Sequence, residues 1–139
     1  MTKTIGTVLG EIYDAWRLQN LDLLATYLPE DFSHHINIPP VMHPLGGARH
    51  GKKAALERLG LIFSQFDTQR LYTSHVVIEG GKAAVEVTTR CLHRPTHAYL
   101  DTKKSNIWTL EDSWPTQLDE YYDIGRFVAF MQKATAHSS

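Results

Sequence analysis

Hydrophobic residues near the start of the chain recur with the period of an α-helix. Between Thr4 and Gln19, apolar residues fall at the i, i+3, i+4 spacing of one helical face, and charged residues occupy most other positions. Asn20 is a good N-cap for a second, shorter helix, which Pro29 must end because proline cannot continue a helix. The pattern predicts two helices packed as an angled pair.

The next segment changes period and predicts a short strand, a loop and a third helix. Over residues 31–38, apolar and polar residues alternate, with His34 on the apolar side and His35 and Asn37 on the other. A cluster of prolines and glycines after this strand enforces a loop. Gly51 then opens a helix whose apolar residues share one face.

The second half of the chain is rich in β-forming residues. Four runs separated by three turn sequences predict strands at about 69–78, 83–93, 98–110 and 117–122, and a closing helix follows at about 124–134. Long strands joined by short turns form an antiparallel meander that twists and coils strongly. We predict one α+β domain over residues 1–139. It is a cone in which a curved antiparallel sheet wraps around the N-terminal helices and encloses a small-molecule pocket.

Composition narrows the classes of function. The 139 residues are 42% hydrophobic, which suffices for one sizeable core. Fourteen Lys and Arg residues nearly balance fifteen Asp and Glu residues, and this balance disfavours nucleic acid or an anionic membrane as a partner. The single Cys91, together with the lack of a signal-peptide pattern and of a long apolar stretch, favours a cytoplasmic setting.

Cofactor motifs are also missing from the sequence. It contains no glycine-rich phosphate loop and no nucleophile-elbow serine, so we expect no nucleotide cofactor. The eight histidines lack convincing ligand spacing, so we expect no metal. The remaining class of function is acid–base chemistry on a neutral organic molecule.

Several short motifs follow one another in a characteristic order. They are Ile-Tyr-Asp-Ala-Trp at 12–16, His-Gly-Lys-Lys-Ala-Ala at 50–55 and Glu-Tyr-Tyr-Asp at 120–123. In this order they resemble the nuclear transport factor 2 superfamily of cone-shaped domains. The chain is most similar to its SnoaL-like polyketide cyclase and ketosteroid isomerase group, with a local likeness to limonene-epoxide hydrolases in Asn37-Ile38-Pro39.

This resemblance implies two classes of function. One is a cofactor-independent enzyme acting on a small hydrophobic carbonyl or epoxide substrate as an isomerase, cyclase, dehydratase or hydrolase. The other is a non-catalytic small-molecule-binding or dimerisation domain, because one fold hosts many functions.

Glu120 is the leading candidate for acid–base catalysis. It falls where the likeness to epoxide hydrolases places a catalytic carboxylate. A glutamate that faces an apolar cavity has a raised pKa, which suits it to proton transfer near neutral pH. The alternative is a structural ion pair, for which Arg90 on an adjacent strand is the expected partner.

The same likeness assigns roles to Asn37 and His35. Asn37 would help to hold a nucleophilic water, and His35 stands at the position of that family's tyrosine. Alternatively, Asn37 is a strand-end residue whose side chain satisfies backbone amides of the loop.

Asn106 and Arg90 are candidates for stabilising an oxyanion. Asn106 matches the position at which ketosteroid isomerases hold a protonated aspartate, and an amide can donate the same hydrogen bond. Arg90 is expected on the inner side of its strand together with Thr88, where its guanidinium could bind a substrate oxygen or neutralise a glutamate. The residues predicted to form the substrate-binding wall are Tyr13, Trp16, Trp108, Thr88 and Tyr122.

Dimerisation is predicted from the strand at 83–93. Val85 and Val87 oppose Glu86 and Thr88, so apolar residues are expected on both faces of the sheet. An apolar outer face needs covering, and a homodimer formed through the sheet would cover it.

Overall fold

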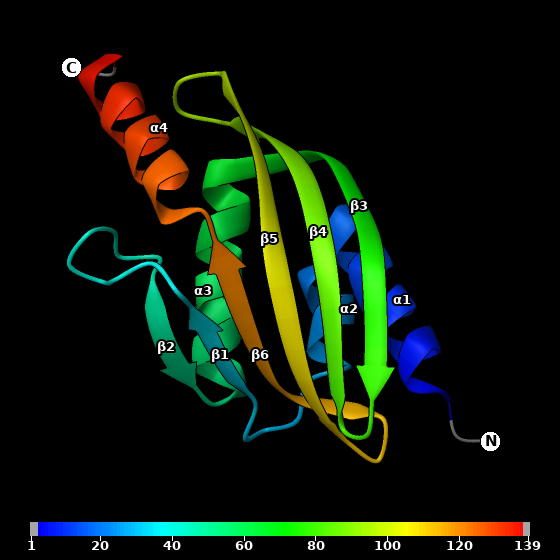
Figure 1. Cartoon of the computed structure of the whole chain (residues 1–139). Helices are drawn as coiled ribbons and strands as arrows, with labels where there is room; N and C mark the ends of the chain where they lie inside the picture. Colours follow the sequence, from blue (N-terminus) through cyan, green and yellow to red (C-terminus); the bar gives the residue numbers. More distant parts are fainter. Residues whose placement is uncertain (1–2, 138–139) are drawn as a thin grey trace.

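One curved sheet flanked by helices organises residues 3–137, the part of the chain that the computed structural model describes (Figure 1). The helices are α1 (Ile5–Arg17), α2 (Leu21–Ala25), α3 (Lys52–Gln65) and α4 (Ile124–His137). The strands are β1 (Ser33–Ile36), β2 (Gly47–His50), β3 (Phe66–Glu79), β4 (Lys82–His93), β5 (Ala98–Glu111) and β6 (Trp114–Tyr122). The α+β cone predicted from the sequence is confirmed.

The N-terminal helices form where the hydrophobic pattern places them. The side chain of Thr4 caps α1 by accepting a hydrogen bond from the amide of Thr7, and the Asn20 side chain caps α2 through the amide of Leu23. The apolar face of α1 packs into the main core beneath the sheet, together with residues of α2, α3 and the long strands. The buried residues of this face are Val8, Leu9, Ile12, Tyr13, Ala15 and Trp16.

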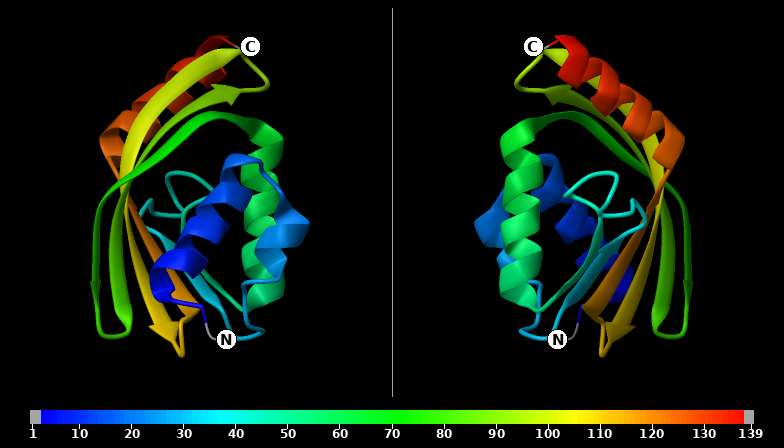
Figure 2. Two further views of the ribbon diagram at one scale, coloured as in Figure 1. Left: turned by 90° about the vertical axis from the view of Figure 1, so that its right-hand side faces the viewer. Right: turned by 90° about the vertical axis from the view of Figure 1, so that its left-hand side faces the viewer.

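The long strands curve over these helices (Figure 2). The sheet order is β2-β1-β6-β5-β4-β3. Two register shifts interrupt the β3–β4 pairing, and between Ser74 and Val77 the chain passes through His75 at a φ of 48°. Such bulges increase local twist and bend a strand, which helps β3 to follow the curve of the cone.

The antiparallel meander expected of the four long strands is confirmed, and the short strands at its edge add a parallel pair. β1 runs parallel to β6, while every other neighbouring pair is antiparallel. β2 was expected to be loop, because it follows the cluster of prolines and glycines and precedes the helix that opens at Gly51. It forms a strand because it pairs with β1, and Gly47 begins it at a φ of 86°, which suits glycine.

The inner face of β4 is the opposite of the one expected. Ala83, Val85 and Val87 are buried against the helices, whereas Thr88 and Arg90 point to the outer face. Apolar residues gain free energy when they leave water, so the alanine and valine positions occupy the core. This result also removes the argument for dimerisation that placed both valines outside.

No helix within residues 3–137 has both the length and the apolar character needed to cross a membrane.

Candidate functional site

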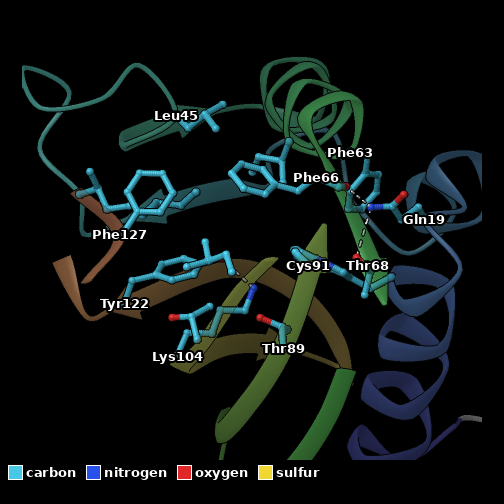
Figure 3. A pocket seen from close by; sticks show the side chains of 16 residues that line it. Gln19, Leu45, Phe63, Phe66, Thr68, Thr89, Cys91, Lys104, Tyr122 and Phe127 are labelled. Carbon is cyan, nitrogen blue, oxygen red and sulfur yellow. Dashed lines mark hydrogen bonds between the residues drawn. The ribbon is translucent and has the colours of Figure 1, made fainter. Parts of the chain in front are cut away.

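A small cavity lies between the concave face of the sheet, α3 and α4 (Figure 3). Its volume is about 70 Å³, and most of its wall is apolar. Phe63 and Phe66 come from the end of α3 and the start of β3, while Leu45 and Phe127 come from the loop before β2 and from α4. The ring of His43 on that loop packs edge-on against the ring of Phe127, with 5.2 Å between the ring centres. The loop and α4 therefore meet beside the cavity.

Lys104 is the one charged side chain among the residues that line this cavity. It lies at an inner position of β5, and only 5% of its surface is exposed. Its ammonium is 4.6 Å from the ring centre of Trp16, 5.2 Å from the ring centre of Tyr122, and donates a hydrogen bond to the Tyr122 hydroxyl at 3.2 Å. Figure 3 shows Lys104 and Tyr122 side by side on the sheet side of the cavity. The apolar cavity therefore has a cationic hydrogen-bond donor in its wall.

Glu120 lies behind Lys104 and is completely buried. One carboxylate oxygen accepts a hydrogen bond from Lys104 and the other pairs with Nε2 of His34. Burial by itself raises the pKa of Glu120, but the charge of Lys104 and the contacts with His34 more than offset burial and hold the pKa below its ordinary value. The expectation of a raised pKa is therefore wrong, and the carboxylate is ionised at neutral pH.

The partner expected for Glu120 is also corrected. An intramolecular ion pair does form, but it is made with Lys104 rather than with Arg90. Arg90 lies on the outer face, 3.5 Å from Asp101, with its guanidinium 4.2 Å from the ring centre of Tyr99. Thr88 lies on the same outer face.

Lys104 stays charged although it is buried. Desolvation lowers the pKa of its ammonium, but the opposing effect of Glu120 and the nearby Tyr122 is larger, so the pKa is raised overall. Burial, reinforced by the Glu120 charge, also raises the pKa of the Tyr122 hydroxyl. Both groups are therefore protonated donors near neutral pH.

His34 completes this buried network from β1. Burial lowers the pKa of its imidazole even though Glu120 opposes the change, so the ring is neutral. A neutral imidazole next to a carboxylate must carry its hydrogen on the facing nitrogen, here Nε2. Nδ1 then has no hydrogen-bond partner among the described residues.

Asn37 does not reach the cavity with its amide. Its Nδ2 donates to the backbone oxygen of Tyr122 at 3.0 Å, and its Oδ1 accepts from the Tyr122 backbone amide at 2.9 Å. The side chain thus continues the pairing of β1 with β6, so it binds backbone groups of a strand and not the loop amides that the structural alternative named. His35 has a different partner, with its Nδ1 3.7 Å from a carboxylate oxygen of Asp119. The structure does not bring Asn37 and His35 together at one site.

Asn106 lies deeper in the cone than the cavity. Tyr13 Oη accepts hydrogen bonds from Asn106 Nδ2 at 2.8 Å and from Trp108 Nε1 at 2.9 Å, and all three side chains are buried. They form a polar cluster inside the hydrophobic core. Of the residues predicted to contact substrate, Trp16 and Tyr122 line the cavity, whereas Tyr13, Trp108 and Thr88 do not.

Sequence reasoning missed Lys104 and His34 as site residues. Lys104 has the same strand parity as Asn106 and Trp108, so the assignment of those two to the inner face already placed it inside. His34 shares its side of the strand with Phe32 and Ile36, which are buried. A polar residue on an apolar face was therefore the available signal for both.

Among residues 3–137, no three His, Cys, Asp or Glu side chains are grouped so that they could hold a metal ion.

A family model described as a SnoaL-like domain matches residues 9–113. The chain belongs to this SnoaL-like family. A search of curated proteins finds no match.

Solved structures with the same fold cover almost the whole SnoaL-like chain. A protein from Rhodopseudomonas palustris, provisionally assigned as an isomerase, is 22% identical with a TM-score of 0.82, and the match covers 96% of this chain and 99% of that one. A polyketide cyclase by provisional assignment, from Xanthomonas campestris pv. campestris, is 16% identical with a TM-score of 0.74, over 90% and 94% of the two chains.

A third similar structure is a protein with a ketosteroid isomerase-like fold from Catenulispora acidiphila, in complex with trimethylamine. It is 12% identical with a TM-score of 0.73, over 88% of this chain and 89% of that one. At such identities these likenesses show the NTF2-like fold and nothing finer.

Removing the buried charge of Glu120 is expected to destabilise the SnoaL-like fold. Glu120→Gln leaves Lys104 as a buried ammonium without its counter-ion, which costs about 3–5 kcal/mol of unfolding free energy. Asp119→Asn is the matched control, because the adjacent carboxylate points to the other side of β6 and is partly exposed. Urea unfolding measures both, and equal stability of the two variants would contradict the role given to the pair.

Acid is expected to weaken the same interaction. The pKa of Glu120 is lower in the folded chain than its ordinary value of 4.5, so its contribution to stability is present above that pH and is lost as the pH falls below it. The double variant Lys104→Met/Glu120→Gln replaces the ion pair with uncharged groups of similar size. Its unfolding free energy should fall less steeply below pH 4.5 than that of the wild type in urea titrations; parallel curves would disprove the assignment.

Proposed function

We propose that this protein is a cofactor-independent enzyme of the isomerase or cyclase type, acting on a small, largely apolar carbonyl compound in the cavity. The observation that carries the proposal is the position of Lys104, a buried ammonium in the wall of an otherwise uncharged cavity. Lys104 and Tyr122 would hold the carbonyl oxygen. The provisional assignments of similar structures as an isomerase and a polyketide cyclase support the same class.

Lys104 suits electrostatic stabilisation of an enolate. When a carbonyl compound loses a proton from its α-carbon, negative charge develops on the oxygen. A cationic donor already in place stabilises that charge without reorganisation, which is the largest single effect in many enzymes. Glu120 keeps Lys104 oriented and protonated, so the ammonium acts as a donor rather than as a base or an amine nucleophile.

The proposed substrate has an acidic C–H bond. Glu120 is ionised, but both of its oxygens are engaged by Lys104 and His34, and it does not line the cavity. A 1,3-dicarbonyl compound loses its proton to water or buffer readily once the enolate is stabilised, and therefore needs no strong protein base. Epoxide hydrolysis has less support, because the amide of Asn37 is engaged by the backbone of β6.

Non-catalytic binding of a small molecule is the second candidate function. It is favoured by the lining of the cavity, which contains no carboxylate and no histidine among the described residues. The volume of about 70 Å³ is also below the roughly 150 Å³ cavity that holds a benzene ring. A ring-sized ligand would require Phe127 and α4 to shift outward.

Exchange of α-hydrogens separates the two candidates. Proton NMR in deuterated buffer would follow acetylacetone, a small 1,3-dicarbonyl compound without a ring, with wild type, Lys104→Met and Lys103→Met. Lys103 is the matched control because it is adjacent in sequence and exposed on the outer face. We expect the wild type and Lys103→Met to accelerate exchange, and Lys104→Met to lose about a hundredfold of that rate.

Two outcomes of this assay would contradict the catalytic proposal. One is an exchange rate of acetylacetone no higher with the wild type than in buffer alone, which would leave the binding function. The other is equal activity of the Lys104 and Lys103 variants.

We also propose that the protein is a homodimer formed through the outer face of the sheet. Tyr72, Tyr99 and Tyr121 are each about half exposed on this face, and they lie among charged residues such as Arg90 and Lys103. Tyrosine and arginine are enriched in protein interfaces. Light scattering coupled to size-exclusion chromatography should give twice the chain mass at micromolar concentration, and a monomer mass alone would rule out the dimer.

A further inference from the structure

The C-terminal helix α4 closes one side of the cavity. It follows β6 after the single residue Asp123 and lies beside β5 (Figure 1). Apolar residues of α4 belong to a second hydrophobic cluster, which is separate from the main core. The buried members of this cluster all line the cavity: Ile36, Ile38, Leu45, Phe66, Leu100 and Phe127. Outward movement of α4 would therefore open the cavity to solvent.

Two ring contacts hold α4 against this cluster, and each of them involves a histidine. The ring of Phe127 meets that of His43, on the loop before β2, with 5.2 Å between the ring centres. The ring of Phe130 meets that of His93, at the end of β4, with 5.7 Å between the centres. Both contacts are edge-on. The helix therefore docks on two imidazoles that come from distant parts of the chain.

Both imidazoles are uncharged at neutral pH while α4 is docked. Nδ1 of His43 accepts a hydrogen bond from the backbone amide of Leu45 at 3.1 Å, so this nitrogen carries no proton. His93 is 5% exposed, and its Nδ1 lies 2.7 Å from the hydroxyl of Thr96. Burial lowers the pKa of each ring below the ordinary value of 6.5. A proton on His43 would also break the contact with the Leu45 amide.

The charges around His43 would oppose a proton on its ring. Arg49 of β2 donates a hydrogen bond to the backbone oxygen of Pro44, the neighbour of His43. Arg58 of α3 donates to the backbone oxygen of Leu45. Both side chains are cations, so a charged imidazole on this loop gains no counter-ion from β2 or α3.

The surroundings of His93 give the same result. The titratable residues on the segments packed against it, which are β3, the turn after β4 and α4, are Asp67, Arg94, His97, Arg126 and Lys133. Asp67 lies 3.7 Å from Arg94 and so already has a counter-ion. The sequence of α4 contains no Asp or Glu. A proton on His93 would therefore be a buried charge without a partner on the helix that covers it.

We propose that α4 is a lid of the cavity that acid releases, and that His43 and His93 are its two pH-sensitive contacts. While both rings are neutral, Phe127 and Phe130 pack on them and the cavity stays closed. A charged imidazole is far more stable in water than in an apolar contact, so protonation favours the undocked helix. Asp123, the single residue between β6 and α4, is the expected hinge. This lid goes beyond the proposed function and does not depend on it.

The direction of the pH effect follows from the lowered pKa values. The undocked helix leaves both rings to bind protons near the ordinary pKa of 6.5, whereas the docked helix delays this to lower pH. Docking is therefore fully stabilised above about pH 6.5. Below that pH, the docking equilibrium constant falls by up to about tenfold per pH unit for each histidine. The ion pair of Glu120 is still intact in this range, because the pKa of that carboxyl is held below 4.5.

Hydrogen–deuterium exchange of the backbone amides tests the lid. Rates would be measured at about pH 7.5 and about pH 5.5 and corrected for the intrinsic pH dependence of exchange. We expect the protection of α4 to fall about tenfold at the lower pH, while that of α1 is unchanged. The double variant His43→Phe/His93→Phe keeps two aromatic rings that cannot be protonated, so it should remove the fall. His50→Phe is the matched control, because His50 is an exposed histidine of β2 outside both contacts.

Cys91 gives a second reading in the wild type. It is the single cysteine of the chain, and it lines the cavity. Its rate of reaction with dithiodipyridine, a chromogenic reagent with two rings, would be divided by the rate of glutathione at the same pH. This ratio should rise about tenfold on acidification, in step with the loss of α4 protection.

Three results would overturn the lid. One is an α4 protection and a Cys91 reactivity that do not change between the two pH values. Another is a folded double variant that loses as much protection as the wild type. The third is an equal loss of protection in α1, which would indicate loosening of the whole fold. If the double variant does not fold, His43→Phe and His93→Phe are measured singly, and each should reduce the fall.

Discussion

The buried ion pair between Lys104 and Glu120 is the interaction on which the site depends. It joins inner positions of the neighbouring strands β5 and β6, and His34 links β1 to the same carboxylate. Without Glu120, the ammonium would be an uncompensated charge inside the cone, which proteins tolerate poorly. Without Lys104, the carboxylate would have only a neutral imidazole as its partner. The two charges therefore keep each other ionised in a place where each alone would become neutral or unfold the chain.

The curvature of the sheet divides the interior into two regions of different character. In the core, Asn106 and Trp108 donate hydrogen bonds to the Tyr13 hydroxyl, and the apolar face of α1 packs around them. Closer to α4, the space is incompletely filled, and Lys104 faces it. Inner positions of one strand, β5, thus supply both regions. Asn106 belongs to the packed core, and Lys104, two residues earlier, belongs to the cavity wall.

Membership of the SnoaL-like family describes the scaffold better than the chemistry. The carboxylate that sequence reasoning chose as a base is held as the counter-ion of a lysine. The proposed chemistry therefore rests on a cation that stabilises negative charge. In this view the glutamate acts through the lysine, as a positioning residue.

The sequence by itself determined the cone and the kind and order of its elements, apart from the short strand β2, which was expected to be loop. Helical periodicity, capping residues and glycine turns act locally, so α1, α3 and the long strands could be read from neighbouring residues. The inner position of Asn106 also followed from strand alternation, and that of Glu120 from the likeness to epoxide hydrolases. Pairing across the sheet, however, depends on residues far apart in the chain. Only the tertiary structure decided that β1 runs parallel to β6, that Val85 rather than Thr88 faces the core, and that Lys104 lies against Glu120. These contacts form because the whole fold must bury its apolar surface and pair its buried charges at the same time. A short stretch of sequence carries no information about that requirement.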